Sequence, residues 1–182
     1  MIYPKNFESR IGFDVIRKEI ERRCISSLGS DYCARMQMSV VKDDIVLKLS
    51  QTNEFLSILQ SKKEFPVNYF FDMRLHLKGI SAPGTFITPD NLFNLRRSLA
   101  TVGEIVNFFA VADGAESPYP CLAALASGMW PFRELLADID RVIDKFGNVK
   151  DSASPHLREL RQQIASSTSS INGIMRRIIA NG

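Results

Sequence analysis

The stretch LRELRQQIASSTSSINGIMRRII, residues 157–179, decides the fold of this chain. Its seam positions alternate three- and four-residue steps over three heptads, at Leu157, Leu160, Ile164, Ser167, Ile171, Ile174 and Ile178. This spacing is typical of the a/d seam of a coiled coil. Ser154 and Pro155 supply a cap and a first turn, so we expect a helix of about 27 residues, roughly 40 Å long. A compact body of this size does not need such a length, and the helix is expected to project.

The apolar seam of this helix predicts a partner that covers it. Ile178 and Ile179 still lie on the apolar face where the sequence stops at Asn181-Gly182. We expect the seam to be covered by a returning segment of the same protein or by another copy. Serine and threonine are weak helix formers, so the serine-rich stretch 166–170 is a soft spot in the helix. We interpret it as small residues packed against the partner, with a hinge as the alternative.

Helical periodicity also dominates the residues before this stretch. Phe13, Ile16, Ile20 and Cys24 are three or four residues apart, which predicts a helix over 12–26 that ends at Gly29. Further helices are predicted over 31–38, 43–62, 73–78, 88–112, 121–128 and 132–141. The fold class expected is therefore all-α, a multi-helical core domain with a long projecting C-terminal helix.

Two of these helices carry clear start signals and inward faces. The helix over 43–62 is predicted to use Asp43 as its N-cap. Its inward residues are predicted to be Ile45, Leu49, Leu56 and Leu59. In the helix over 88–112, Thr88 caps, Pro89 occupies the first position and Asp90 favours the positive helix end. The stripe that must be buried there is Leu92, Leu95, Leu99, Val102, Ile105 and Phe109.

Two segments depart from helical periodicity. VIDKFGNVK, residues 142–150, has two short β-branched runs across a Gly-Asn turn and predicts one small β-hairpin. FPVNYFF, residues 65–71, holds four aromatic residues in seven and is predicted to plug the core, because aromatic side chains bury large areas. A base-stacking platform is the alternative, but no Arg or Lys lies within this loop.

Length and composition set the broad class. The 182 residues fit one domain, or one domain with an appendage. Hydrophobic residues make up 45% and charged residues 24%, which excludes a disordered or collagen-like chain. No apolar run is long enough to span a membrane, and the first ten residues hold no signal peptide, so a cytoplasmic protein is expected. A compact body of this size buries on the order of 70% of its unfolded surface, and we expect it to fold without disulfides or metals.

We find no set of residues suited to catalysis. The sequence contains no GxxxxGK[ST], GxGxxG, HExxH or GxSxG motif, and no cofactor or metal is expected in this fragment. Cys24, Cys33 and Cys121 form no CxxC pair and are interpreted as reduced structural thiols. His76 and His156 stand 80 residues apart and are interpreted as surface histidines.

The acidic and basic pairs are treated as structural. Asp43-Asp44 and Asp138-Asp140 sit at helix ends or beside basic residues, where capping and the helix dipole explain them. Arg22-Arg23 and Arg96-Arg97 are dispersed on different helices and are interpreted as ordinary surface.

The tail is basic on a neutral body. Residues 1–153 carry no net charge, whereas residues 154–182 carry +3. Four arginines in that tail are candidate phosphate contacts for nucleic acid: Arg158, Arg161, Arg176 and Arg177. Arginine pairs bidentately with phosphate, which favours this role, and a solvated coiled-coil flank is the alternative.

Two stretches carry a family resemblance. The first is IGFDVIRKEIERRCISSLGSDYC, residues 11–33, and the second and more specific is IDKFGNVKDSASPHLRELRQQI, residues 143–164. The second matches a signature at Asp144, Gly147, Val149, Asp151, Ala153, Ser154, Leu157 and Arg161. Both resemble the second branch of bacterial MutS-type proteins, and the order of helices between them fits as well. The segment MQMSVV, residues 36–41, departs from the Leu-x-Pro expected there.

The resemblance implies the N-terminal core and lever portion of a larger protein. In the family the long helix leads to a clamp at the DNA end and returns antiparallel, which supplies the missing seam partner. An ATPase domain that binds ATP and Mg²⁺ and a small nuclease-type domain follow, outside these residues. By the resemblance we expect no mismatch-reading domain, because the core signature begins near residue 11.

The parent protein is by resemblance an ATP-dependent dimer. It acts on branched or recombining DNA, in suppression of recombination and in DNA repair, and a ribosome-rescue role is also attributed to the branch. The expected organisation is a helical core over 1–141, a hairpin connector over 142–153 and the first strand of a lever over 154–182. The function expected is a mechanical relay; the alternative is a scaffold that self-associates through the seam from Leu157 to Ile178.

Overall fold

The computed structural model describes residues 7–111 and 115–181. Its helices in that part of the chain are α1 (Phe7–Arg10), α2 (Phe13–Arg22), α3 (Ser27–Ala34), α4 (Lys42–Gln60), α5 (Arg74–Gly79), α6 (Pro89–Phe109), α7 (Pro120–Ala126), α8 (Arg133–Val142), the 3₁₀-helix η1 (Asp151–Ala153) and α9 (Pro155–Asn181). The fold is all-α, as predicted. Extended pairing within the described residues is limited to one antiparallel bridge, between Ile143 and Val149.

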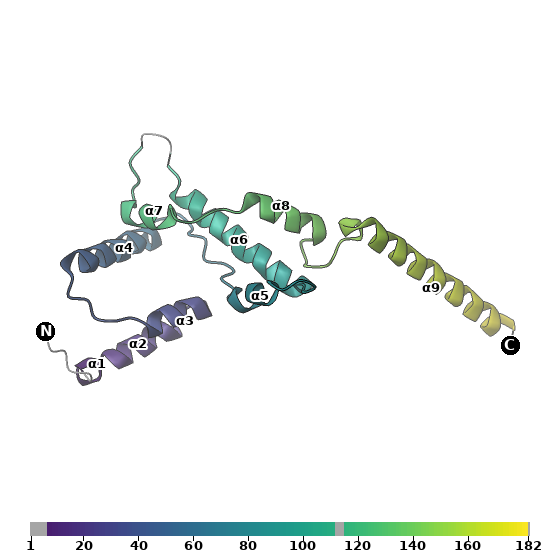
Figure 1. Ribbon diagram of the computed structural model, residues 1–182, viewed down its shortest axis with the longest axis horizontal. Helices are drawn as coiled ribbons and strands as arrows, with labels where there is room; N and C mark the ends of the chain where they lie inside the picture. Colours follow the sequence, from purple (N-terminus) through teal and green to yellow (C-terminus); the bar gives the residue numbers. More distant parts are fainter. Residues whose placement is uncertain (1–6, 112–114, 182) are drawn as a thin grey trace.

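The helices form an elongated body from which α9 extends at one end (Figure 1). α6 crosses the middle of the body and packs against α7 and α8. α4 packs on α7, and α2 packs on α1 and α3. The 3₁₀-helix η1 contacts both α8 and α9, so it forms the connection between the body and the projecting helix.

α6 is the central helix because its sequence gives it a strong start and little polar surface. The hydroxyl of Thr88 accepts a hydrogen bond from the N–H of Asn91 at 3.4 Å, and Pro89 occupies the first turn. Every residue from 91 to 103 is at least partly buried. The predicted cap and helix are confirmed; Ala112, the predicted last residue, lies outside the described residues, and the helix ends at Phe109.

α4 contributes a carboxylate that caps α7. The two carboxylate oxygens of Glu54 accept hydrogen bonds from the N–H groups of Cys121 and Leu122, at 3.0 and 2.8 Å. Burial raises the pKa of Glu54, but these backbone donors outweigh it and the pKa lies below its usual value. Because the first N–H groups of a helix lack partners within it, this carboxylate ties α4 to α7.

The aromatic loop over 65–71 packs into the body, as predicted. Phe65 makes edge-to-face contacts with Phe55 of α4 and Phe108 of α6, each with 5.1 Å between ring centroids. Such geometry adds to the free energy gained from burial. The loop therefore joins two helices that are distant in sequence.

Arg97 of α6 belongs to this aromatic region, so the expectation that it lies on ordinary surface is wrong. Its guanidinium lies 4.6 to 4.7 Å from the ring centroids of Phe93, Tyr69 and Phe71. One of its nitrogens also donates to the side-chain oxygen of Asn94 at 2.5 Å. Cation–π attraction explains why an arginine is tolerated here.

The first helices end and begin at other residues than predicted. The helix expected over 12–26 stops at Arg22, and the helix expected over 31–38 is α3, which begins at Ser27. Gly29 therefore lies within α3 and does not end α2. The reason is Ser26, whose hydroxyl accepts a hydrogen bond from the Gly29 N–H at 3.1 Å and so caps α3.

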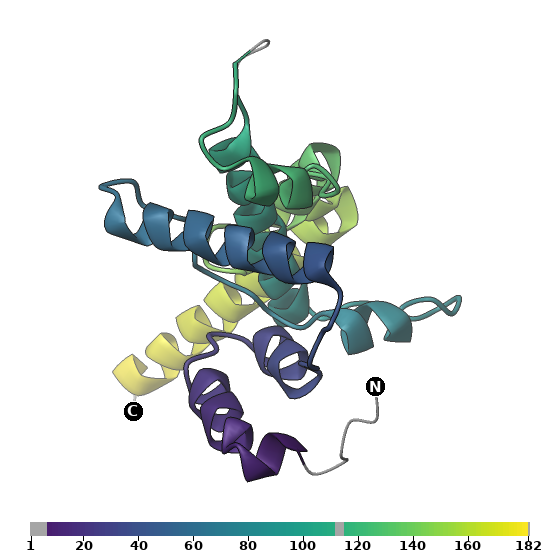
Figure 2. The same ribbon diagram turned by 90° about the vertical axis from the view of Figure 1, so that its left-hand side faces the viewer.

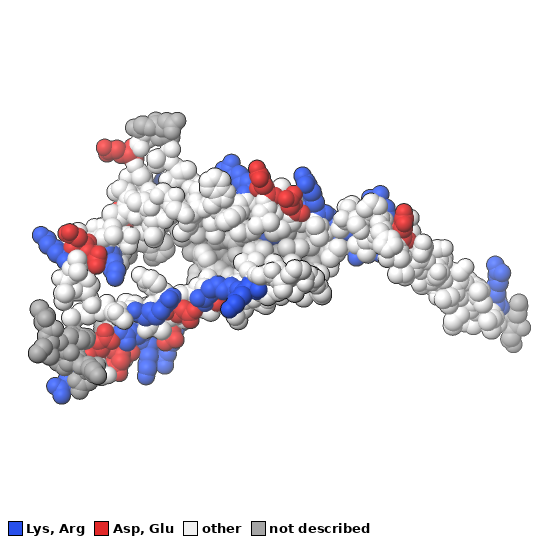
Figure 3. Space-filling model, viewed as in Figure 1, with Lys and Arg blue, Asp and Glu red and all other residues white. Residues whose placement is uncertain are grey.

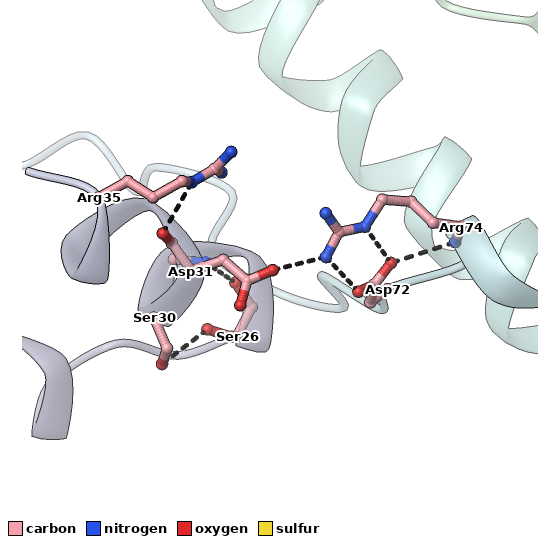
Figure 4. A network of polar contacts seen from close by, with 7 residues as sticks. Ser26, Ser30, Asp31, Arg35, Asp72 and Arg74 are labelled. Atoms are coloured by element: carbon pink, nitrogen blue, oxygen red, sulfur yellow. Dashed lines mark hydrogen bonds and ion pairs between the residues drawn. The ribbon is translucent and has the colours of Figure 1, made fainter.

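A network of ion pairs links α3 to the segment before α5 (Figure 4). Arg74 donates to Asp31 of α3 and to Asp72, each at 2.6 Å. Hydrogen bonds from Arg74 lower the pKa of Asp72 to about 2. More than half of the Arg74 side chain is exposed, so this link orients α3 more than it stabilises the fold.

The predicted inward face of α4 is turned outward. Its four residues are 39–64% exposed, namely Ile45, Leu49, Leu56 and Leu59. Ile58, on the opposite side of the helix, is fully buried. The physical reason is that the opposite face, anchored by Glu54 on α7, packs against the body and leaves the strongest apolar stripe free.

α9 matches its prediction closely. It runs for 27 residues from Pro155 to Asn181, and the hydroxyl of Ser154 caps it by accepting a hydrogen bond from the Leu157 N–H at 3.1 Å. The serine-rich stretch 166–170 is helical throughout. The helix leaves the body and extends away from it (Figure 1).

The surface area shows how open this arrangement is. The chain exposes 14367 Å². A compact monomer of 20.5 kDa exposes about 8,900 Å², and its unfolded chain about 30,000 Å². The chain thus buries only about half of its unfolded surface, and the expected 70% is wrong. The shortfall arises because large apolar residues are exposed on α4 and α9 and also elsewhere, among them Val15 of α2, Leu75 of α5 and Trp130.

In the part of the chain that the structure describes, no helix is long and apolar enough to cross a membrane. The expectation that the first ten residues hold no signal peptide falls partly on residues 1–6, outside the described residues. The division into 1–141, 142–153 and 154–182 stays a prediction; α8 ends at Val142 and α9 begins at Pro155.

Candidate functional site

The residues between α8 and α9 form a compact turn; together with the first turns of α9 it makes up the joint, residues 143–161. It begins at Ile143, which is only 1% exposed and pairs with Val149 in the antiparallel bridge. The N–H of Asp144 donates to the Asn148 carbonyl at 2.8 Å, and the N–H of Lys150 donates to the Val142 carbonyl at 2.9 Å. The predicted hairpin is thus reduced to one bridge and a tight turn, because the paired runs are too short for strands.

Asp144 organises the turn. Its carboxylate accepts hydrogen bonds from the N–H groups of Asn148 and Phe146, at 2.9 and 2.8 Å. These donors, that of Asn148 first, hold the pKa of Asp144 below its usual range. An aspartate that bonds backbone N–H groups two and four residues ahead fixes a tight turn.

Gly147 is required by both conformation and space. Its φ of +88° lies in the left-handed region, which favours glycine. A Cβ at this position would lie 3.0 Å from the ring of Phe93 on α6. The turn therefore rests closely on the central helix.

The joint is fastened to α9 by Arg161. One guanidinium nitrogen donates to the Val149 carbonyl at 3.0 Å and also pairs with the Asp151 carboxylate. Ser154 caps the helix, and Ala153 and Leu157 are partly buried at its base. All eight residues of the family signature thus lie in the joint, each with a structural contact there.

A second set of contacts fastens the joint to the body. The ammonium of Lys150 donates to the Asp140 carbonyl at 2.5 Å, and Arg96 of α6 bonds both carboxylate oxygens of Asp140, at 2.7 and 3.2 Å. The side chain of Asp140 raises the pKa of Arg96. The expectation that Arg96 is ordinary surface is wrong, because it joins α6 to α8.

The acidic pairs have two different roles. Asp43 and Asp44 lie in the first turn of α4, where the helix dipole favours them, but the residue at the N-cap is Val41 and not Asp43. Asp140 binds Arg96 and Asp138 pairs with Arg141. The second pair therefore serves ion pairing, and the expected capping role is wrong for it.

The four candidate phosphate-binding arginines do not form one cluster. Arg161 is engaged in the joint, and Arg158 lines a small surface pocket beside it with Ser152 and Glu159. Arg176 and Arg177 are exposed near the tip of α9. Figure 3 shows charged side chains at the base and at the tip of this helix, with an uncharged stretch between them.

The spacing of these arginines sets what they can contact. Arg158 and Arg176 are 18 residues apart, which is five turns and about 27 Å along the same side of the helix. That side is opposite the apolar seam. The two arginines thus lie at separate positions along α9. A nucleic-acid role for the four arginines stays a prediction.

The other candidate groups show no sign of chemistry. His76 and His156 are both exposed on separate helices. The three cysteines are free, and Cys33 is buried with its thiol donating to the Arg17 carbonyl at 3.3 Å. Among the residues that the structure covers, no group of three or more His, Cys, Asp or Glu is placed to hold a metal ion.

Sequence reasoning missed several contacts that build the site. The signature residues were singled out by the family resemblance, but nothing in the sequence pairs Arg96 with Asp140 or Arg161 with Val149 and Asp151. The approach of Phe93 to Gly147 also joins residues 54 positions apart. Such long-range pairs leave no periodic signal in the sequence.

The chain is similar to curated proteins named Endonuclease MutS2. Those of Geobacillus sp. (strain WCH70) and Geobacillus thermodenitrificans (strain NG80-2) are 25% and 28% identical over 167 residues, which is 92% of this chain and 21% of each relative. That of Thermomicrobium roseum is 25% identical over 168 residues, again 92% of this chain and 21% of the relative. No protein-family model matches the chain. The chain is thus related to MutS2 proteins and spans about a fifth of their length.

Proposed function

We propose that this chain is the core and lever portion of a MutS2-type protein that acts on DNA. In this proposal α9 is one of two helices that form a coiled-coil arm, and the joint passes movement between the body and that arm. The observation that carries it is the exposed apolar seam of α9 on a helix that leaves the body from a tightly bonded base. Five of its six large apolar residues are 41–66% exposed: Leu160, Ile164, Ile171, Ile174 and Ile178.

The joint has the properties that a relay needs. Movement is transmitted only if the base of the arm does not swivel freely. Arg161 holds α9 to two acceptors in the turn, and Lys150 and Asp144 hold the turn to α8 and to itself. Arg96 then continues the chain of contacts into α6. Packed elements and polar networks of this kind carry coupling between distant sites.

For the wider function, the relatives' name, Endonuclease MutS2, supports an action on DNA, and the family resemblance supplies the rest of the proposal. The parent protein is an ATP-dependent dimer that suppresses recombination and takes part in DNA repair by binding branched or recombining DNA. ATP and Mg²⁺ bind in its ATPase domain, and DNA cleavage takes place in its nuclease-type domain. The ribosome is a second partner of the same branch. A cytoplasmic location accords with these roles.

This chain by itself is expected to bind DNA weakly. Only about four arginines can reach phosphates, and each phosphate contact weakens binding as the salt concentration rises. A gel shift with a duplex and a four-way junction should therefore show no stable complex at physiological salt. Tight binding that resists salt would contradict this assignment.

The relay is tested in a chimera. Residues 1–182 replace the matching segment of the Geobacillus thermodenitrificans relative, and ATP hydrolysis and nucleotide-dependent DNA binding are both measured. Arg161→Ala, which frees the base of α9, should leave ATP hydrolysis unchanged and lower the effect of nucleotide on DNA binding several-fold.

Arg141→Ala is the matched control. It removes an arginine close to the joint whose ion pair, with Asp138, stays within α8. This variant should keep both activities. The relay is refuted if Arg161→Ala retains full nucleotide dependence, or if both variants lose it equally.

A second candidate function is a scaffold in which two copies pair through the seam of α9. The exposure of that seam favours it. Light scattering distinguishes the two functions: a concentration-dependent dimer of this chain that Ile171→Asp abolishes supports the scaffold. The same measurement on a longer chain is needed, because a returning arm would cover the seam and remove the dimer.

A further inference from the structure

A second exposed apolar seam lies on α4, at the opposite end of the body from the tip of α9 (Figure 1). Its residues alternate four- and three-residue steps: Ile45, Leu49, Thr52, Leu56 and Leu59. Leu49 and Leu59 are 64% and 63% exposed. Viewed from the end opposite α9, α4 lies across the front of the molecule (Figure 2). This is heptad spacing on a helix of 19 residues, and it predicts a helical partner.

We propose that this face of α4 is an interface between two copies of the chain, paired antiparallel about a two-fold axis at Thr52. The proposal goes beyond the relay, which uses only α9 and the joint. A two-fold interface must be self-complementary, because the same surface of each copy meets the other.

The seam is self-complementary about Thr52. Ile45 and Leu59 stand seven residues before and after Thr52, so each faces the other residue in the partner copy. Leu49 stands three residues before Thr52 and Leu56 four residues after it, so each lies within one residue, about 1.5 Å along the helix, of exact opposition to the other. Antiparallel packing therefore stacks isoleucine on leucine and leucine on leucine at both ends of the interface.

Charge favours the antiparallel direction. Lys42, Asp43 and Asp44 give the start of α4 one net negative charge. The residues after its end are Lys62, Lys63 and Glu64, which carry one net positive charge. An antiparallel pair brings opposite charges together at both ends, whereas a parallel pair brings like charges together. The opposed helix dipoles act in the same direction.

Thr52 suits the centre of the interface. Its hydroxyl donates to the Lys48 carbonyl at 2.8 Å within the helix, so burying it leaves no hydrogen-bond donor without a partner. Its methyl group is then free to pack on the same residue of the other copy. A short side chain at the axis also lets the two helices approach closely.

The opposite face of α4 is already occupied by the body. Ile58 is fully buried there, and Glu54 caps α7. The helix therefore keeps its place when the seam is changed, and substitutions on the seam do not remove core residues. This separation makes the interface testable without unfolding the chain.

The experiment measures the oligomeric state of the full chain by sedimentation equilibrium up to about 0.2 mM, where a pair with a Kd of about 0.1 mM is mostly dimeric. All measurements use the Ile171→Asp background, so that α9 does not contribute. The expected result is a dimer, and Leu49→Asp is expected to raise its Kd about 30-fold or more, as for a central contact of an interface.

The geometry has its own test by cysteine cross-linking. Thr52→Cys places two thiols at the axis, and mild oxidation should give a covalent dimer. Ser57→Cys is the matched control, because Ser57 is exposed on the same helix away from the seam. The unsubstituted chain reports cross-linking through its own three cysteines.

Two results overturn the proposal. One is a monomer at every concentration in the Ile171→Asp background, with helix content by circular dichroism unchanged. The other is equal cross-linking of Thr52→Cys and Ser57→Cys. Either result leaves the relay untouched, because the relay is tested at the joint in the chimera.

Discussion

The joint and the rest of α9 are adjacent in sequence, but they differ in burial and in the hydrogen bonds that their side chains make. In the joint, Ile143 is buried, Asp144 bonds two backbone N–H groups and Arg161 bonds two acceptors. Beyond Arg161, almost every residue of α9 is exposed. The difference teaches that contacts within the described residues fix the base of α9 and leave most of its length uncovered. Substitutions of the same kind in the two regions should therefore have unequal effects.

The largest contrast is expected from losing an apolar side chain. Ile143→Ala should lower the free energy of unfolding by about 3 kcal/mol, because it opens a cavity beneath the joint. Ile164→Ala, at a seam position of α9 that is 65% exposed, should change it by less than about 0.5 kcal/mol. Urea denaturation followed by circular dichroism measures both. Equal losses would show that α9 is packed against the body in solution.

A smaller but still distinct effect is expected at the two glycines. Gly147→Ala should destabilise the joint by about 2 kcal/mol, because alanine is strained at a φ of +88° and its Cβ meets Phe93. Gly173→Ala lies within α9 in open space and should stabilise that helix by about 0.5–1 kcal/mol. Amide hydrogen exchange by NMR reports each region separately. A stabilising Gly147→Ala would contradict the described turn.

The sequence predicts α9 and α6 well because strong local signals act in the same direction there. Thr88-Pro89 and Ser154-Pro155 mark the starts, and both caps are observed. Local signals fail where two compete. The Ser26 cap outweighs Gly29, so α3 begins earlier than predicted. Periodicity alone also cannot say which body covers a stripe, which is why the inward face of α4 was predicted wrongly.

The joint was predictable in its residues and not in its contacts. The family resemblance singled out Asp144, Gly147 and Asp151, and the turn lies where the Gly-Asn pair predicted it. The contacts beside it come from α6, about 50 residues earlier in the chain, where Phe93 lies against Gly147 and Arg96 binds Asp140 of α8. Those pairs depend on the tertiary arrangement, and no local pattern encodes them.

The third contrast concerns the caps at the starts of α9 and α6. Ser154→Ala removes the acceptor for the Leu157 N–H and should cost about 1 kcal/mol. Because the start of α9 packs on the short η1 and not on another helix of the body, the loss should appear as faster amide exchange over its first turn. Thr88→Ala removes the corresponding cap of α6, where packing on α7 and α8 supports the helix, and local exchange should change less. Similar changes at both starts would mean that α9 is as well supported as α6.

The smallest effect is expected from the charge of Asp144. Its pKa is below the usual value in the folded chain, so its hydrogen bonds contribute stability at pH values above the unfolded pKa of about 3.9. This contribution is lost as the pH falls through the lower folded value. The melting temperature of Asp144→Asn should therefore be lower than that of the unsubstituted chain at pH 6, and the gap should narrow below about pH 4.

Asp151→Asn sharpens this test, because it also removes one charge from the joint. Asp151 accepts from an arginine side chain, whereas Asp144 accepts from backbone N–H groups of its own turn. Added salt should weaken the exposed ion pair of Asp151 and leave the turn of Asp144 nearly unchanged, since screening acts on separated surface charges. If salt reduces both effects equally, Asp144 acts through surface charge and not through the turn that positions α9.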